Sequence, residues 1–67
     1  MKFKPDETYF YWNLNKTTIL EGKVKRSYLI KEKDYELEGY IDYDGTDCNM
    51  LGSMHKTKED CINEDVD

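Results

Sequence analysis

Apolar and polar residues alternate in three segments of the chain, and a period of two predicts half-buried strands. In the first segment, residues 7–14, both parities are apolar: the even positions are Phe10, Trp12 and Leu14, and the odd positions are Tyr9 and Tyr11. We therefore expect one face to pack inward and the other to be partly exposed or covered by the C-terminal segment. Residues 13–16 then form a turn, because asparagine tolerates left-handed backbone angles.

The second segment, residues 17–31, alternates more cleanly. One parity is mostly apolar and predicts a core-facing side: Leu20, Gly22, Val24, Tyr28 and Ile30, interrupted only by Arg26. The other parity is mostly charged and suits solvent. A glycine within a strand marks a bulge or a bend, so Gly22 is where we expect the strand to turn.

The third segment, residues 35–43, has the clearest alternation. Its predicted core face holds Tyr35, Leu37, Gly39, Ile41 and Tyr43. Its predicted solvent face holds Glu36, Glu38, Tyr40, Asp42 and Asp44. A polar turn at residues 32–34 joins it to the second segment, and antiparallel pairing would oppose lysines to glutamates across the two strands, which stabilises the pair.

Weaker signals follow the turn at residues 44–47. Residues 48–54 form a short apolar patch, either a last strand or a loop that closes the core. Thr57 and Asp60 have the spacing of a capping box, which predicts a short helix at residues 58–64 with Cys61 and Ile62 facing the core. Residues 65–67 form a frayed tail.

These elements predict a mainly β fold in one domain spanning residues 1–67: a small, strongly bent antiparallel sheet or SH3-like barrel with a short C-terminal helix. Residues 3–9, FKPDETY, resemble the Pro-Gly-Asp-x-Val opening of the first strand in the SH3-like small β-barrel superfamily, with Asp6 in place of the glycine. Residues 19–24, ILEGKV, are similar to its x-Gly-x-Val second strand. The resemblance covers residues 3–43 and implies a module that binds a peptide, a protein or a nucleic acid, without chemistry of its own.

Length and composition narrow the function classes. The chain has 67 residues, of which 37% are hydrophobic, and a chain this short buries only about 60% of its unfolded surface. That excludes a two-domain enzyme, a cofactor-binding α/β fold and a large interior pocket, so we expect no enzyme and no cofactor. No apolar run approaches the ~20 residues that a membrane-spanning helix needs. Nine aromatic residues argue against disorder.

Charge is distributed unevenly along the chain. The net charge is −5, with +4 on residues 1–33 and −9 on residues 34–67, an asymmetry that indicates a partner surface or an acidic tail. An acidic chain is a poor ligand for a phosphate backbone. The N-terminus lacks an apolar signal segment, so we expect a cytoplasmic protein in which Cys48 and Cys61 are small apolar side chains rather than a disulfide.

The sequence contains two partial metal-site patterns, and neither is complete. Cys48, His55 and Cys61 are chemically suited to zinc, but they form no Cys-x-x-Cys pair and lack a fourth ligand. The acidic turn at residues 42–47 has glycine in the fourth position of a calcium loop rather than the sixth, and Ser53 in the twelfth instead of glutamate. A surface histidine between packed thiols and a solvated acidic turn are the simpler interpretations.

Tyrosines and carboxylates on the predicted outward faces form the candidate site for a protein partner: Tyr9, Tyr11, Glu36, Glu38, Tyr40, Asp42, Asp44 and Asp47. Tyrosine is favoured at binding interfaces, and carboxylates on alternate strand positions lie ~6.6 Å apart, close to the ~7 Å between phosphates that the charge density of DNA implies. Two simpler interpretations stay open: the tyrosine face packs under the helix, and the acidic face only maintains solubility.

Two functions follow from these observations. The first is a non-enzymatic interaction protein, because short acidic chains of this kind resemble accessory proteins of phages and mobile elements, some of which block a host nucleic-acid-binding protein. The alternative is a nucleic-acid-binding module that contacts phosphates and stacks bases. Its residues would be Lys23, Lys25, Arg26 and Lys31, with Tyr9, Tyr11 or Trp12 for stacking. Because so few strands leave one strand edge open, we expect either a monomer or a homodimer that pairs through its edge strands.

Overall fold

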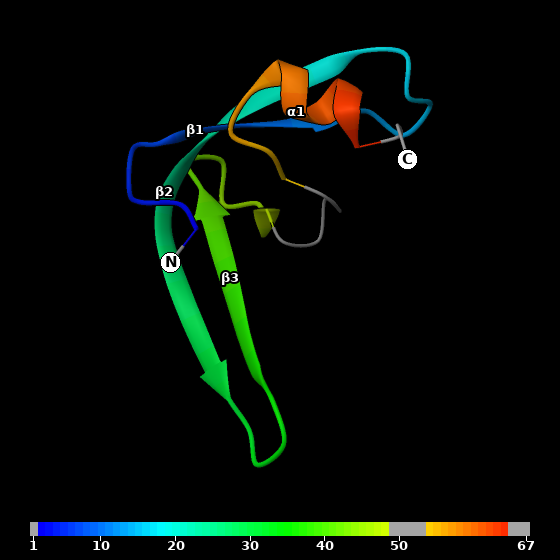
Figure 1. Ribbon diagram of the computed structural model, residues 1–67. Coiled ribbons are helices and arrows are strands. Elements are labelled where there is room, and N and C mark those ends of the chain that lie inside the picture. Colours follow the sequence, from blue (N-terminus) through cyan, green and yellow to red (C-terminus); the bar gives the residue numbers. More distant parts are fainter. Residues whose placement is uncertain (1, 49–53, 65–67) are drawn as a thin grey trace.

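The computed structural model describes residues 2–48 and 54–64 of the chain. It contains three strands, β1 (Thr8–Trp12), β2 (Ile19–Lys31) and β3 (Glu36–Asp42), and one helix, α1 (Lys58–Asn63) (Figure 1). The strands are antiparallel and lie in the order β1-β2-β3. The prediction of a mainly β fold with a bent antiparallel sheet and a short C-terminal helix is therefore confirmed, and the sheet is open. The SH3-like resemblance stays a prediction.

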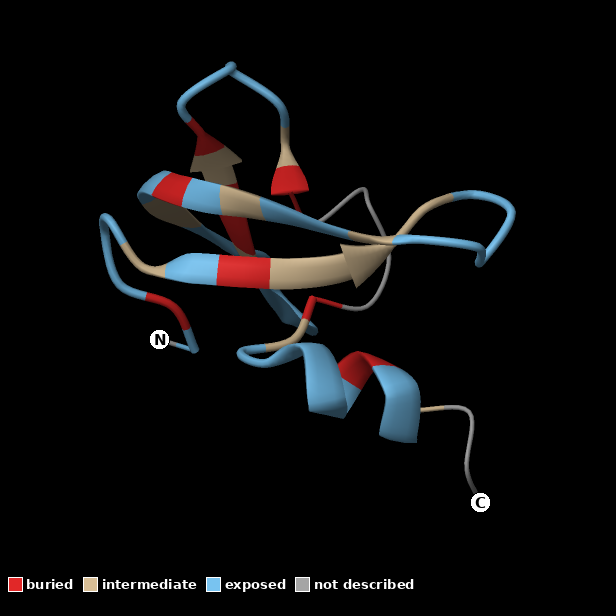
Figure 2. Ribbon diagram, turned by 90° about the horizontal axis from the view of Figure 1, so that it is seen from above, coloured by how far each residue is buried: buried red, intermediate tan, exposed pale blue. Residues whose placement is uncertain are grey.

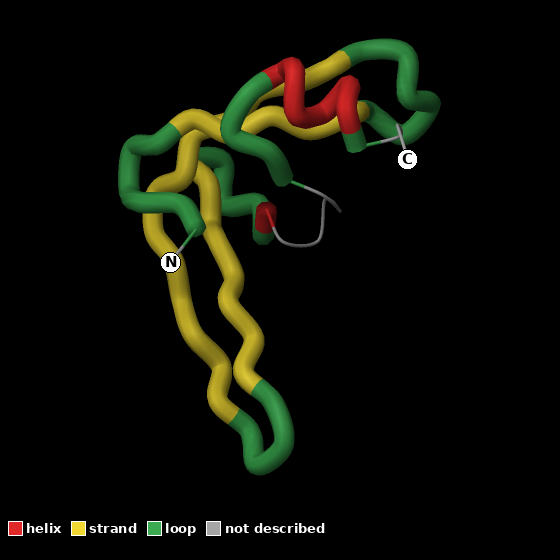
Figure 3. Tube along the Cα trace, viewed as in Figure 1, coloured by secondary structure: helices red, strands yellow, loops and turns green. Residues whose placement is uncertain are grey.

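The long strand β2 is divided between two partners. Residues 19–23 pair with β1, and the part from Val24 onward pairs with β3. Beyond this division β2 and β3 continue as a two-stranded ribbon that projects from the rest of the molecule (Figures 1 and 3). The Cα radius of gyration is 12.6 Å, whereas a compact domain of this length has about 11 Å. The projecting ribbon accounts for the elongation.

A bulge in β2 decides which faces point inward. The register shifts between Val24 and Arg26, so that Val24 lies opposite Asp42 but Ser27 lies opposite Tyr40. Because side chains alternate strictly along a strand, one extra residue exchanges the two faces. The sequence placed this irregularity at Gly22, and that position was wrong.

The exchange overturns the predicted faces of the third segment. Tyr40 and Asp42, expected in solvent, are buried, while Leu37 and Tyr43, expected in the core, are exposed. In the second segment Val24 is buried as predicted, whereas Leu20 and Ile30, predicted in the core, are exposed. In the first segment Leu14 is exposed in the turn that the sequence predicts at residues 13–16. The pairing of the two long strands is nevertheless confirmed, with Lys31 opposite Glu36.

The core is small and aromatic, and it lies where the sheet bends (Figure 2). Its buried residues are Phe3, Tyr9, Val24, Tyr40, Cys48 and Met54. The Phe3 ring meets the rings of Tyr9 and Tyr40 edge to face, with centroids 6.3 Å and 5.4 Å away. The Tyr40 hydroxyl also accepts hydrogen bonds from the backbone N–H groups of Lys2 (3.0 Å) and Phe3 (3.3 Å). The N-terminal segment is therefore held against the sheet by one buried ring.

A tight turn leads from that segment into β1. The N–H of Glu7 donates to the carbonyl of Lys4 at 3.1 Å, and Asp6 adopts a φ of 69°. This left-handed conformation favours glycine, and aspartate is one of the few other residues that tolerate it. Asp6 therefore takes the backbone conformation for which glycine is suited, at the position where the sequence resemblance has glycine.

The helix α1 begins at the predicted cap. The Thr57 hydroxyl accepts from the N–H of Asp60 at 3.1 Å, and Cys61 is buried, whereas Ile62 is exposed, contrary to expectation. The Trp12 indole N–H donates to the carbonyl of Cys61 at 2.8 Å. The expectation that the C-terminal segment covers one face of the first strand is thus confirmed. Most of the predicted apolar patch, residues 49–53, and the predicted frayed tail, residues 65–67, lie outside the described residues.

Two glycines in the sheet lie directly beneath tyrosine rings. Gly22 is paired with Tyr9, and Gly39 with Tyr28. A Cβ on Gly22 would lie 2.5 Å from the Tyr9 hydroxyl oxygen, and one on Gly39 would lie 2.0 Å from the Tyr28 ring. Each glycine therefore makes room for an aromatic side chain from the neighbouring strand.

We expect Gly22→Ala to destabilise the protein by about 1–3 kcal/mol, the usual cost of overpacking, because Tyr9 is buried and has no room to move. Gly39→Ala is the comparison: moving the half-buried Tyr28 ring breaks its hydrogen bond to Asp47 but leaves the buried core in place, so its cost is smaller. Urea denaturation measures both. Equal stability of Gly22→Ala and the unsubstituted protein would contradict the close packing.

Candidate partner-binding surface

The eight predicted partner-binding residues differ in how far the structure buries them. Tyr9, Tyr40 and Asp42 are buried, so their assignment to an exposed surface was wrong. The half-buried members are Tyr11, Glu38 and Asp47, and the exposed ones are Glu36 and Asp44. The predicted continuous acidic and tyrosine-rich surface is therefore not formed, because the bulge turns its middle into the core.

The carboxylate of Asp42 has a structural role at the inner end of β3. Its Oδ1 accepts from the N–H groups of Asp44 (3.0 Å) and Thr46 (2.8 Å), and its Oδ2 accepts from the Tyr9 hydroxyl at 3.2 Å. Gly45 completes the turn with a φ of 82°. Asp42 thus closes the turn after β3 and joins it to β1. Residues 43–46 of the turn are exposed as predicted, whereas Asp42 is buried.

Other tyrosine hydroxyls also donate to carboxylates. Tyr28 donates to Asp47, and Tyr43 donates to Asp6. These bonds raise the pKa of both tyrosines, because the neutral hydroxyl is the donor. The pKa of Tyr9 is raised far more, first by burial and then by Cys48 and Asp42. Several acidic residues therefore serve the fold as hydrogen-bond acceptors.

The thiols and the histidine form no metal centre among residues 2–48 and 54–64. Cys48 and Cys61 are free and buried, and burial raises the pKa of both thiols. His55 contacts Glu64 through Nε2, and its backbone pairs with Phe10 in β1. These contacts attach the C-terminal segment to the sheet. In the same part of the chain, no helix has the length and apolar character required to span a membrane.

The most prominent exposed apolar feature is the far half of the β2–β3 hairpin. We define the outer hairpin surface as Tyr28, Ile30, Tyr35 and Leu37; Ile30 and Leu37 are directly opposed and share the face of Tyr28. Tyr35 is 60% exposed, Leu37 43% and Ile30 40%. Sequence reasoning assigned this face to the core, because alternation alone identifies an apolar face without showing whether anything covers it.

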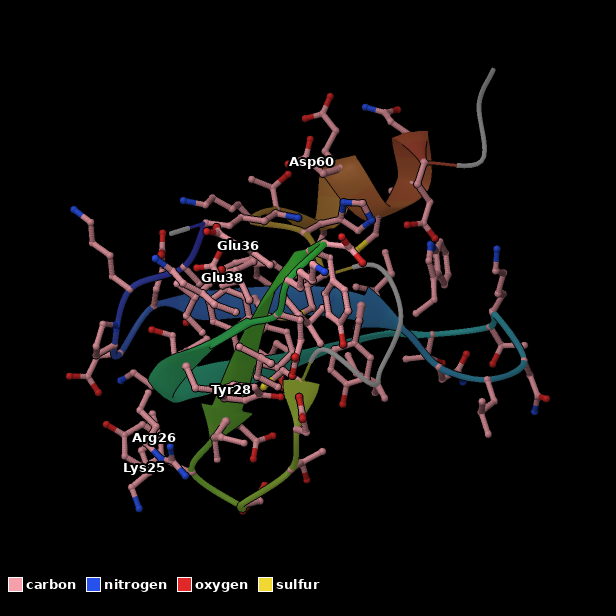
Figure 4. All side chains as sticks on the ribbon, turned by 90° about the horizontal axis from the view of Figure 1, so that it is seen from below. Lys25, Arg26, Tyr28, Glu36, Glu38 and Asp60 are labelled. Atoms are coloured by element: carbon pink, nitrogen blue, oxygen red, sulfur yellow. The ribbon has the colours of Figure 1, made fainter. Side chains whose placement is uncertain are left out.

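The residues predicted for the alternative function, nucleic-acid binding, differ in their exposure. Lys25 and Arg26 are exposed on β2, and Figure 4 shows them apart from the carboxylates of Glu36 and Glu38. The aromatic residues proposed for base stacking are engaged within the protein instead: Tyr9 is buried, and Tyr11 stacks on it with ring centroids 5.6 Å apart. The prediction of an exposed stacking platform is thus wrong for Tyr9.

Comparison with known proteins gave no match: neither protein-family models, nor curated proteins, nor solved structures resemble the chain significantly.

Replacing the buried acceptor tests its structural role. Asp42→Ala leaves the Tyr9 hydroxyl and two backbone N–H groups without their acceptor, so we expect a loss of about 1–3 kcal/mol in the free energy of unfolding. The control is Asp44→Ala, whose exposed side chain should change stability by less than about 0.5 kcal/mol. Similar values for the two variants in urea denaturation would refute the role of Asp42.

The raised tyrosine and thiol pKa values predict alkaline instability. The ordinary pKa values are 10.0 for tyrosine and 9.0 for cysteine, and the folded chain holds these protons more tightly. Stability is thus fully present below about pH 9 and falls as the pH rises further, with Tyr9 contributing up to about 1.4 kcal/mol per pH unit above its ordinary pKa. Denaturation across this range measures the slope. Tyr9→Phe should have a shallower slope; an unchanged slope would count against Tyr9 as a source.

Proposed function

We propose that this chain is a non-enzymatic interaction protein that binds a protein partner through the outer hairpin surface. The observation that carries the proposal is the exposure of Ile30, Tyr35 and Leu37 on a ribbon that extends beyond the core. A two-stranded ribbon is marginally stable alone, and a contiguous exposed apolar patch marks an interaction site. Tyrosine and branched apolar side chains on a protruding element are suited to fill pockets on another protein.

The charge on the β3 side of this surface supports a basic partner, whereas residues 23–33 of β2 and its turn carry five basic residues and one acidic residue. Residues 34–48, which include β3 and its flanking turns, contain six acidic residues and no lysine, arginine or histidine. Complementary charge accelerates association and selects partners. The resemblance to accessory proteins of phages and mobile elements points to a host nucleic-acid-binding protein, since such proteins carry the basic surfaces that bind phosphates.

The proposal is tested by capture from nuclease-treated lysate with the immobilised protein. Ile30→Ser combined with Leu37→Ser removes the opposed apolar pair, and we expect captured partner to fall about tenfold or more, as for truncation of central interface residues. Leu20→Ser is the matched control, because Leu20 is 39% exposed and Ile30 is 40% exposed, but Leu20 lies in the part of β2 that pairs with β1.

Circular dichroism first establishes that each variant is folded. Undiminished capture by the double variant, or equal loss in Leu20→Ser, would contradict the assignment of the interface to this hairpin. Loss of all capture after nuclease treatment would instead favour the nucleic-acid alternative.

A further inference from the structure

We infer that the outer edge of β3 binds an extended, basic segment of the partner as an additional strand of the sheet. This inference rests on the proposed function and specifies the mode of binding and the chemistry of the partner. Strand addition of this kind obtains its affinity from backbone hydrogen bonds and its specificity from alternate side chains.

The direction of the β3 peptide groups follows from the hairpin register. The N–H of Glu32 donates to the carbonyl of Tyr35 at 2.8 Å, which makes these residues a hydrogen-bonded pair. Hydrogen-bonded and non-hydrogen-bonded pairs alternate along an antiparallel ladder. Lys31–Glu36 and Leu29–Glu38 are therefore non-hydrogen-bonded pairs, and the peptide groups of Glu36 and Glu38 face away from β2.

The other side of β3 is occupied only near its inner end. Ile41 bridges to Asp47, and the N–H of Asp42, which also faces away from β2, donates to the carbonyl of Thr46 at 3.0 Å. Within residues 2–48 and 54–64, no strand pairs with that edge along residues 36–39. An unpaired strand edge is a template for another strand.

The side chains along this edge specify the incoming strand. Glu36 and Glu38 lie on one face of β3, and Leu37 lies on the other, within the outer hairpin surface. On its inner side β3 already has a neighbour of matching pattern, since Lys31 is opposite Glu36 with 3.8 Å between the charged groups, and Ile30 is opposite Leu37. A segment that places lysine or arginine beside Glu36 and a branched apolar residue beside Leu37 repeats this match on the outer side.

Charge also argues against a second copy of this chain at the same edge. Antiparallel pairing of two β3 strands would bring the glutamates of one copy close to those of the other, and like charges across a strand pair are destabilising. Each chain carries a net charge of −5, which adds repulsion. The basic partner segment is therefore the occupant that the edge favours.

The test uses two synthetic peptides of about six residues, the usual length of a strand. One alternates lysine and valine, and the other alternates glutamate and valine. Titrated into the isotopically labelled full chain, the lysine peptide should bind at least about tenfold more tightly, weaken with added salt, and slow hydrogen exchange at the amides of Glu36 and Glu38.

Two variants make the result specific. Glu36→Lys combined with Glu38→Lys should reverse the preference between the peptides. Glu36→Pro removes an outward N–H without removing a bond to β2, so it should weaken binding of the lysine peptide, and circular dichroism establishes that this variant is folded.

Equal binding of both peptides, or protection at amides outside residues 36–39, would overturn the inference. Absence of binding would overturn it as well, whereas lysate capture that still depends on Ile30 and Leu37 would leave the proposed function standing. A concentration-dependent dimer whose amide protection maps to residues 36–39 would replace the basic segment by a second copy.

Discussion

The structure depends on the bulge between Val24 and Arg26 in β2. On one side of it, β2 pairs with β1 and places Val24 in the core; on the other, it pairs with β3 in exchanged register. The exchange brings Tyr40 and Asp42 inward, where Tyr40 meets Phe3 and the Asp42 carboxylate accepts from the Tyr9 hydroxyl. The bulge thus allows one long strand to serve two pairings and one small core.

That core is too small to cover the whole sheet. Its buried residues come from the N-terminal segment, the middle of the sheet and the loops around Cys48 and Met54, and they reach no further along the hairpin than Tyr40. Ile30 and Leu37 pair with each other on the face of the ribbon opposite to Tyr40 and Asp42, where no layer covers them among the described residues. The same shortage of apolar material that limits stability leaves a surface suited to another molecule.

The strands, their pairing and the helix cap were predictable, because alternation, turn residues and the Thr57 cap are local signals. Which face of each strand points inward could not be predicted, because the bulge follows Val24 and no glycine marks its position. Gly22, the glycine in this strand, instead makes room for the Tyr9 ring. The candidate site inherited this error at Tyr40 and Asp42. Tyr9 was assigned to the surface because both faces of the first segment are apolar, but its hydroxyl, bonded to a carboxylate, is as readily accommodated inside.

Native-state hydrogen exchange of the whole chain tests this organisation most directly, because it reports local opening residue by residue. The account requires the strongest protection where β2 meets both neighbours, at Tyr9, Val24 and Ile41, whose strands form the buried centre. It requires clearly weaker protection at the ladder amides of Ile30 and Leu37, which open without disturbing the core. Protection of those hairpin amides equal to that of the core would contradict it, since the ribbon would then belong to one continuous stable unit.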